Sequence, residues 1–260
     1  MNTSVFDAMP LWLVLVLTVI VILLAIEVGF RAGIDRARKS ENERQAPIDP
    51  MVGSTLGLLA FVLAFTFGMA TSRYDARKQL VVDDAIAIRT ADLRAQQLPE
   101  PARTEIRARL REYVDVRVEG AVTLSKLPQS LARSEELQDR LWARGLQLGQ
   151  QDPPVASAGP FMQALIQMIE LHAKRVIGGI HNRIPFTIWM ALYCMTALAM
   201  AITGYRAGIS GRRSMIATLT MVLAFSAVIV LIADLDRPQQ GFVKVSQQAM
   251  VDLQTRLRSH

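Results

Sequence analysis

Apolar residues along this chain gather into four blocks, and the stretches between the blocks are polar and rich in charge. Each block is long enough for a helix to cross the hydrocarbon core of a bilayer, which is about 30 Å thick. The clustering of apolar residues, more than their average content, indicates an integral membrane protein. It predicts four transmembrane helices, near residues 9–30, 51–71, 185–203 and 214–234.

The second apolar block passes into a charged stretch without a helix breaker. No proline or glycine interrupts the chain from Met69 to Leu98. The simplest interpretation is one helix that spans the bilayer and projects into water. At 1.5 Å per residue, a helix over residues 53–98 is about 70 Å long, roughly twice the thickness of the hydrocarbon core.

Residues 72–183 show apolar positions at helical spacing, interrupted by prolines, and no convincing alternation of the kind typical of strands. The pattern predicts helices near residues 72–98, 102–124, 131–148 and 160–180. The expected fold is an all-α integral membrane protein with four transmembrane helices and an α-helical soluble bundle inserted between the second and third. The expected domains are a first helix pair with a basic linker, the soluble bundle, a second helix pair and an amphipathic C-terminal tail, over residues 1–71, 72–183, 184–236 and 237–260.

One face of the second apolar helix combines small, aromatic and hydroxyl residues at three- or four-residue spacing, which places them along one stripe. The stripe continues to Asp75, and its candidate pore-lining members are Gly57, Phe61, Ala64, Phe65, Gly68, Thr71 and Ser72. Small residues let membrane helices approach closely, so packing explains the pattern. The alternative is an oligomeric pore wall, with phenylalanine rings at a hydrophobic constriction.

Several charged residues lie at the predicted membrane boundaries: Glu27, Arg73, Asp75, Arg183, Asp234 and Asp236. An acid at such a boundary is costly unless it is solvated or paired. Glu27 either reaches the headgroups or faces inward to an arginine of another helix. Asp234 and Asp236 either cap a helix end in an Asp-Arg-Pro turn, or form a cation or proton site, or pair with Arg73.

Three arginines lie four residues apart on one predicted helix of the soluble bundle: Arg103, Arg107 and Arg111. Like charges at this spacing repel each other mildly on an isolated helix. They form either a solvated face that is paired with acids of neighbouring helices, or a basic vestibule that gathers anions.

Signals for enzymatic chemistry are weak. The three histidines have no ligand-like spacing, the single cysteine, Cys194, lies inside an apolar block, and no glycine-rich phosphate loop or nucleophile elbow is present. We therefore expect no enzyme, cofactor or metal site. The formal net charge of +6 is attributed to membrane topology and lipid contact, so nucleic acid is not an expected partner.

Two stretches carry a resemblance to a known family. The first is GLLAFVLAFTFGMA at Gly57–Ala70, followed by SRYDARKQLV at Ser72–Val81. The second is DLDRPQQGFVKVS at Asp234–Ser246. Both resemble signatures of the bacterial bestrophin-like domain family of membrane proteins.

This resemblance implies a distant relation to bestrophins, which are pentameric anion channels with four helices per subunit and an apolar, aromatic neck on the second helix. Phe61, Phe65 and Phe67 are the nearest candidates for such a neck. The expected function is an oligomeric, channel-like membrane protein that favours anions, with lipid, inorganic ions and copies of itself as partners. The alternative is a non-conducting scaffold or sensor whose soluble bundle binds a partner.

Membrane orientation follows from the short loops, because long domains translocate largely regardless of charge. Residues 31–50 hold five basic residues and residues 204–213 hold three, whereas the tail before Leu11 holds none. This balance places both loops in the cytoplasm of a bacterial inner membrane, with the soluble domain and both termini outside. The resemblance to bestrophins favours the opposite orientation.

Overall fold

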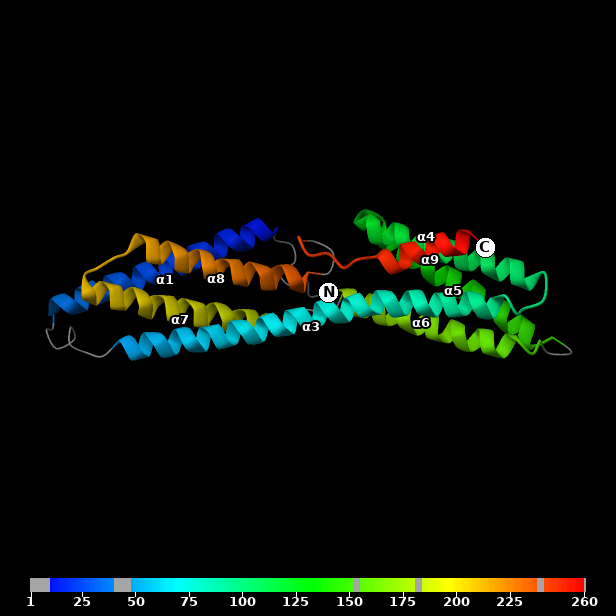
Figure 1. The fold of residues 1–260 in the computed structure, drawn as a ribbon, viewed down its shortest axis with the longest axis horizontal. Helices are drawn as coiled ribbons and strands as arrows, with labels where there is room; N and C mark the ends of the chain where they lie inside the picture. The colour runs from blue at the N-terminus through cyan, green and yellow to red at the C-terminus, as the bar shows by residue number, and fades with distance from the viewer. Residues whose placement is uncertain (1–9, 40–47, 152–154, 181–183, 238–240, 260) are drawn as a thin grey trace. The chain divides into compact units, whose positions relative to one another are not determined.

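The structure is a computed structural model, and it describes residues 10–39, 48–151, 155–180, 184–237 and 241–259. These residues form α-helices and one short 3-10 helix, with no β-strand among them, so the all-α prediction is confirmed for the described chain. The elements, labelled as in Figure 1, are α1 (Leu11–Lys39), α3 (Asp49–Ala95), α4 (Ala102–Val122), η2 (Leu124–Lys126), α5 (Leu127–Gly149), α6 (Ala158–Ile180), α7 (Phe186–Ser210), α8 (Met215–Asp236) and α9 (Gln248–Arg258).

Four of these helices, α1, α3, α7 and α8, are long and apolar enough to cross a bilayer. They match the four predicted segments. Two of them extend further than predicted: α1 continues through the polar residues to Lys39, and α7 continues through Gly204 to Ser210. The turn after α7 is therefore confined to residues 211–214, where Gly211 adopts a left-handed φ of 64° that caps the helix.

Prolines mark helix starts more closely than the sequence suggested. Pro50 lies in the first turn of α3. Pro128 was expected to precede a helix near Leu131, but α5 already begins at Leu127. The reason is that the first turn of a helix needs no N–H from proline, whose fixed φ already suits it.

Helix α3 is a single unbroken helix of 47 residues, as predicted. At 1.5 Å per residue its length is about 70 Å. The chain divides into two compact units, and the boundary falls within this helix. Unit 1 contains residues 1–74 and 183–244, and unit 2 contains residues 75–182 and 245–260.

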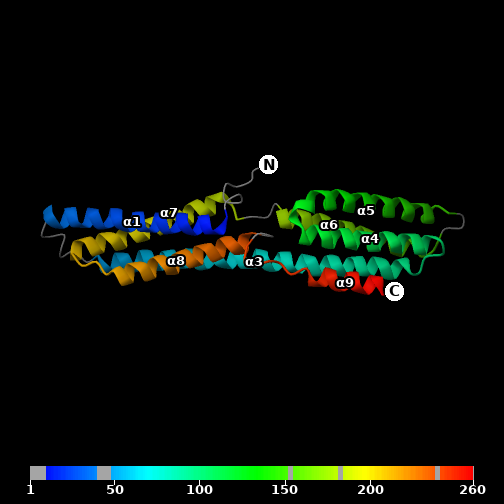
Figure 2. The ribbon, with the colours of Figure 1, turned by 90° about the horizontal axis from the view of Figure 1, so that it is seen from above.

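In unit 1, helix α1 lies along α7 with their backbones in contact, and α8 and the first part of α3 lie beside them (Figures 1 and 2). Gly33 of α1 faces Gly208 of α7, and Gly29 of α1 lies against the backbone of Ala201. A Cβ added to Gly204 would lie 2.1 Å from the carbonyl oxygen of Ile26, so no side chain fits there. The core of this unit is apolar and includes Val14, Ile22, Leu59, Leu63, Leu192, Met200, Val222, Ile229 and Ile232.

In unit 2, helices α4, α5, α6 and α9 pack with the second part of α3 (Figure 2). The stripes predicted for the bundle are buried, including Ile106, Leu110, Val114, Leu137, Leu141, Leu148, Phe161 and Leu165. Helix α9 has the predicted amphipathic character, and it buries Met250, Leu253 and Leu257 in the bundle core. Helix α9 thus belongs to unit 2.

Candidate functional site

The small and aromatic stripe of α3 lies on the outside of unit 1. Phe61 is 67% exposed and Phe65 is 63% exposed, although both are large apolar side chains. Gly57, Ala64, Gly68 and Ser72 are also exposed. Thr71 is half-buried, and its hydroxyl donates to the carbonyl oxygen of Phe67 over 3.0 Å. Contacts within the chain therefore leave this face of α3 uncovered.

The glycines of this face have no packing role within the chain. A Cβ added to Gly57 or Gly68 would meet nothing within 4 Å, whereas one added to Gly29 of α1 would lie 1.9 Å from the carbonyl oxygen of Ala201. Glycine inside a helix is less favourable than alanine by roughly 0.5–1 kcal/mol. The glycines of α1 and α7 are explained by close helix contact, but Gly57 and Gly68 are not.

The other uncovered faces of unit 1 have a different composition. On α1, α7 and α8 they carry mainly branched or flexible aliphatic side chains, as expected beside lipid tails, including Leu24, Val28, Met190, Leu198, Leu219 and Leu223. Only α3, among the described helices of this unit, combines exposed glycines with exposed phenylalanines in its apolar part. This face of α3 is therefore the candidate functional surface.

Glu27 forms ion pairs with two arginines. It accepts from Arg31, one turn later on α1, over 2.8 Å, and from Arg213, in the turn before α8, over 3.0 Å. The Arg213 guanidinium also lies 5.1 Å from the centre of the Phe30 ring. Glu27 is thus paired, but it stays partly exposed and its second partner lies in a turn rather than on another helix.

The acids of the Asp-Leu-Asp-Arg-Pro signature hold the chain that follows α8. Asp234, 2% exposed, accepts from the backbone N–H of Phe242 over 2.9 Å and of Val243 over 3.0 Å. Asp236 accepts from the backbone N–H of Ile184 over 3.0 Å. Gly241 has a φ of 153°, and a Cβ there would lie 1.9 Å from Asp234 Oδ1. Both carboxylates thus accept from backbone N–H groups outside α8.

The remaining boundary residues take no part in that arrangement. Arg73 lies 3.8 Å from the sulfur of Met69, and it does not pair with Asp234, whose two oxygens are both used by backbone N–H groups. Asp75 is exposed. Arg183 lies outside the described residues.

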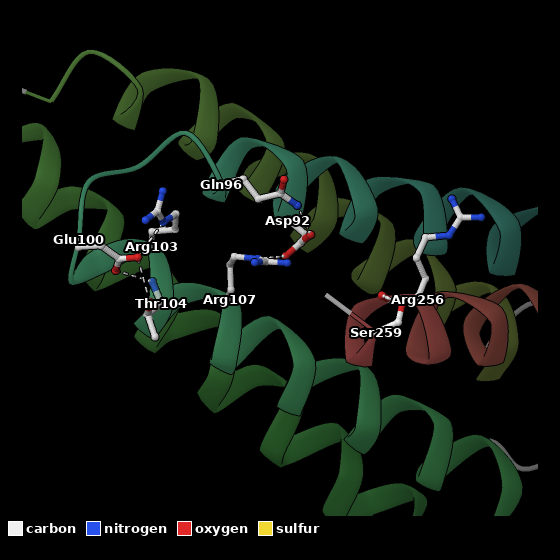
Figure 3. Close-up of polar contacts among 8 residues, drawn as sticks. All are labelled: Asp92, Gln96, Glu100, Arg103, Thr104, Arg107, Arg256 and Ser259. Atoms are coloured by element: carbon white, nitrogen blue, oxygen red, sulfur yellow. Dashed lines mark hydrogen bonds and ion pairs between the residues drawn. The ribbon is translucent and has the colours of Figure 1, made fainter.

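Two of the three arginines considered as a vestibule are paired with acids (Figure 3). Arg103 pairs with exposed Glu100 over 2.7 Å, and Arg107 pairs with Asp92 of α3 over 2.9 Å. The Asp92 carboxylate also accepts from Gln96 over 2.9 Å. Arg111 is half-buried and has no ion pair among the described residues, and its Nε is buried without an acceptor. The structure thus leaves only Arg111 of this set without a neutralising partner in the described chain.

Sequence reasoning missed a buried charged cluster in unit 2. Asp84 of α3 is fully buried, and its Oδ2 accepts from Arg117 of α4 and from Arg175 of α6, each over 2.8 Å. Arg175 also donates to the side chain of Gln247, next to α9. One carboxylate thus connects three helices. Its partners are 33 and 91 residues away, so no local spacing could have revealed it.

A hydrogen-bonded chain lies close to this cluster. Gln138 donates to the Tyr113 hydroxyl over 3.1 Å, and that hydroxyl lies 3.0 Å from His172 Nδ1. Burial raises the pKa of Tyr113 to about 12. Burial, followed by the charge of Arg117, lowers the pKa of His172 to about 4, although Asp84 acts in the opposite direction. His172 is therefore neutral at pH 7 and belongs to the bundle core.

The described residues hold no group of three or more His, Cys, Asp or Glu side chains that could bind a metal ion. Among the described residues, contacts within the chain do not explain the composition of the exposed face of α3. This face, rather than a polar cluster, is therefore the candidate functional site.

Comparison with solved structures relates this fold to bacterial bestrophin homologs. A crystal structure of a point mutant of the homolog from Klebsiella pneumoniae has a TM-score of 0.66 and 15% identity, with 92% of this chain and 97% of that chain covered. A second mutant of the same homolog has a TM-score of 0.59 and 15% identity, with 95% and 97% covered. At this identity the likeness shows the fold alone. A search of curated proteins gave no match.

The family profile for the bestrophin-like domain matches residues 16–250. The matched region contains α3 with its exposed face and the acids that hold the chain after α8. It also contains both stretches whose resemblance was noted in the sequence. The chain therefore belongs to the bestrophin-like domain family.

Proposed function

We propose that this protein is a homo-oligomeric ion channel in which the α3 helices of several copies surround the ion path. The observation that carries the proposal is the exposed face of α3, where Phe61 and Phe65 lie beside glycines that contact nothing within the chain. Glycine on a membrane helix lets another helix approach closely. A second copy of α3 gives Gly57 and Gly68 the role that the single chain does not.

Phe61 and Phe65 form the constriction in this proposal. They lie four residues apart, so their rings project from the same side of the helix. Rings of apolar side chains around an axis gate ion flow by excluding water.

Subunit number and ion preference rest on the relation to bestrophins. That relation favours a pentamer and anions. The basic vestibule contributes less than the sequence suggested, because Glu100 and Asp92 neutralise Arg103 and Arg107. Arg111 is the remaining member of the set that can attract an anion through its field.

In the proposed arrangement, unit 1 lies in a bacterial inner membrane and unit 2 is the soluble bundle inserted between the second and third spans. The short basic loops face the cytoplasm, and the bundle and both termini lie outside. The charge of the loops supports this orientation. A C-terminal reporter pair tests it: active alkaline phosphatase supports it, and fluorescent green fluorescent protein with inactive phosphatase reverses it.

Ion flux from liposomes tests the channel directly. Phe61→Ala and Phe65→Ala together widen the constriction, so we expect faster flux than in the unchanged protein. The matched control is Met190→Ala with Leu198→Ala, which removes two exposed apolar side chains from α7. Flux that responds equally to both pairs removes the assignment of the constriction. Reversal potentials in asymmetric chloride then give the ion preference.

Crosslinking tests the assembly without requiring conduction. Single cysteines at positions 61 and 65, in a Cys194→Ala background, are expected to form dimers on oxidation in membranes. Cysteines at positions 190 and 198 of α7 serve as controls and are expected to remain uncrosslinked. A monodisperse monomer in membranes contradicts the proposal. Crosslinked oligomers that carry no flux favour the non-conducting scaffold.

A further inference from the structure

One end of unit 1 gathers most of its basic residues. This loop end is defined as residues 27–39 of α1, residues 48–49, and residues 206–214. Both ribbon views show the end of α1, the start of α3 and the turn between α7 and α8 at the same end of the unit (Figures 1 and 2). Ion pairs join the three segments, since Arg213 reaches Glu27 and Arg206 reaches Asp49.

The described residues of the loop end include seven basic side chains and three acidic ones. The basic residues are Arg31, Arg36, Arg38, Lys39, Arg206, Arg212 and Arg213. The inner ones use two of the three acids: Arg31 and Arg213 share Glu27, and Arg206 takes Asp49. The third acid, Asp35, is exposed and makes no ion pair with a described residue.

Three further basic residues of the loop end have no acidic partner among the residues that the structure describes. Arg38, Lys39 and Arg212 are exposed, and none of them forms an ion pair with a residue that the structure describes. Arg38 and Lys39 end α1, and Arg212 lies in the turn before α8. Three charges thus project from the end of the unit, beyond the pairs that hold its segments together.

Exposed apolar side chains follow Arg212 along the chain. Directly after Arg212 and Arg213, helix α8 begins with Met215, which is 73% exposed, and Ile216, which is 81% exposed. Leu219, one turn further, is 60% exposed. A phospholipid can contact both the basic and the apolar part of this surface. Its phosphate would lie at the arginines and its acyl chains along the start of α8. A free anion satisfies only the first part.

We propose that the loop end binds the headgroups of acidic phospholipids, with Arg38, Lys39 and Arg212 in contact with the lipid phosphates. Attraction of a basic residue to an anionic membrane surface corresponds to about a fivefold change in affinity per residue. The proposal requires unit 1 to lie in a bilayer, but it does not require the protein to conduct ions.

Lipid competition on the full chain tests the proposal. The protein, purified in a non-ionic detergent, is mixed with equal amounts of phosphatidylglycerol and phosphatidylcholine, and bound lipid is counted by native mass spectrometry. We expect phosphatidylglycerol to predominate. The variant with Arg38→Gln, Lys39→Gln and Arg212→Gln is expected to lose this preference by roughly two orders of magnitude, since three contacts are removed.

The matched control removes the same charge from unit 2. Lys78→Gln, Arg89→Gln and Arg94→Gln change three exposed basic residues of α3 that form no ion pair with a described residue. The control is expected to keep the lipid preference of the unchanged protein. Equal losses in the two variants, or no preference in the unchanged protein, overturn the proposal. If Arg212→Gln alone is the only stable variant, an unchanged preference in it likewise counts against the contact.

Competition with inorganic phosphate distinguishes a lipid site from a site for any phosphate anion. Because the apolar start of α8 is part of the surface, phosphate at the concentration of the lipid is expected to leave bound phosphatidylglycerol in place. Complete displacement by such phosphate shows a simple anion site and contradicts a lipid site. These results do not depend on whether the protein conducts ions. The lipid proposal and the channel proposal can therefore be contradicted independently of each other.

Discussion

At the scale of single residues, the strongest constraint is the carboxylate of Asp84. It is fully buried, and two guanidiniums share one of its oxygens. Removing one partner of a buried ion pair leaves the other charge without compensation. Asp84 therefore stabilises the bundle by compensating the positive charges of Arg117 and Arg175.

Asp84→Asn is expected to destabilise unit 2 by about 3–5 kcal/mol, because two buried cations lose their counter-charge. Thermal or denaturant unfolding of the full protein, followed by helical circular dichroism, measures the loss. The neighbouring Asp83→Asn is the control, since Asp83 is partly exposed and, among the described residues, accepts from Gln79 alone. A similar cost for the two substitutions would contradict the assignment.

His172 makes the stability of the bundle depend on pH. Its pKa is lowered to about 4 in the folded chain, against 6.5 for the ordinary side chain, and it is 4% exposed. As the pH falls below 6.5, the unfolded chain binds a proton that the folded chain does not. Stability is therefore lost between pH 6.5 and pH 4, by up to about 3 kcal/mol, and is unaffected above that window.

Replacing this histidine isolates its effect from those of the carboxylates. His172→Gln keeps an acceptor for the Tyr113 hydroxyl but cannot take up a proton. Urea unfolding between pH 7.5 and pH 5 is expected to give a shallower decline for the variant than for the unchanged protein. Asp84, Arg117, Arg175 and Tyr113 surround the site in both proteins. Parallel declines would show that His172 does not titrate in this range.

At the scale of elements, glycine has two different roles. In α1 and α7 it permits backbone contact within the chain, and in α3 it faces outward. The sequence alone does not separate these roles, because all of these glycines lie in apolar helices. The two roles are distinguished by the atoms that lie next to each glycine in the folded chain.

Gly204→Ala is expected to destabilise unit 1 by roughly 1–3 kcal/mol, because the new Cβ would lie 2.1 Å from the carbonyl oxygen of Ile26. Gly57→Ala meets nothing within the chain and is expected to leave the monomer unharmed. Thermal unfolding in detergent compares the two, and crosslinking at position 61 reports assembly. A Gly57→Ala protein that assembles normally would show that this glycine is not at a helix contact.

Helix α9 acts as part of the bundle. It buries Met250, Leu253 and Leu257, and Asp115 of α4 accepts from its Gln254 over 2.7 Å and from its Arg258 over 2.8 Å. Ending the chain after Gln247 removes three buried side chains, each contributing about 2 kcal/mol. We expect the bundle to lose most of its stability, as seen by faster proteolysis within residues 75–182. Ending the chain after Arg258 is the control and is expected to leave the digestion pattern unchanged.

At the scale of the whole molecule, the chain is two units with separate cores. One core combines buried apolar side chains with glycine contacts between α1 and α7, and the other adds ion pairs around Asp84. Such a division is suited to a membrane part and an aqueous part, because charged pairs are poorly tolerated in lipid. The exposed surfaces differ accordingly, with aliphatic faces on α1, α7 and α8 and the distinct face on α3.

The sequence by itself determined the features that depend on neighbouring residues. Four apolar runs gave four spans, and the absence of breakers after Met69 gave the unbroken α3, because helix formation and membrane insertion respond to local patterns. The stripes of the bundle helices were also visible as spacing. The composition of the α3 face was evident too, but not whether the chain itself would cover it.

Only the tertiary structure decided which residues meet across long separations. It paired Asp84 with Arg117 and Arg175, it gave both oxygens of Asp234 to the backbone after α8, and it paired Arg107 of α4 with Asp92 of α3. It also separated buried glycines from exposed ones. The physical reason is that the effect of a charge or a glycine on stability depends on the atoms within a few ångströms of it. Packing of distant segments decides which atoms those are.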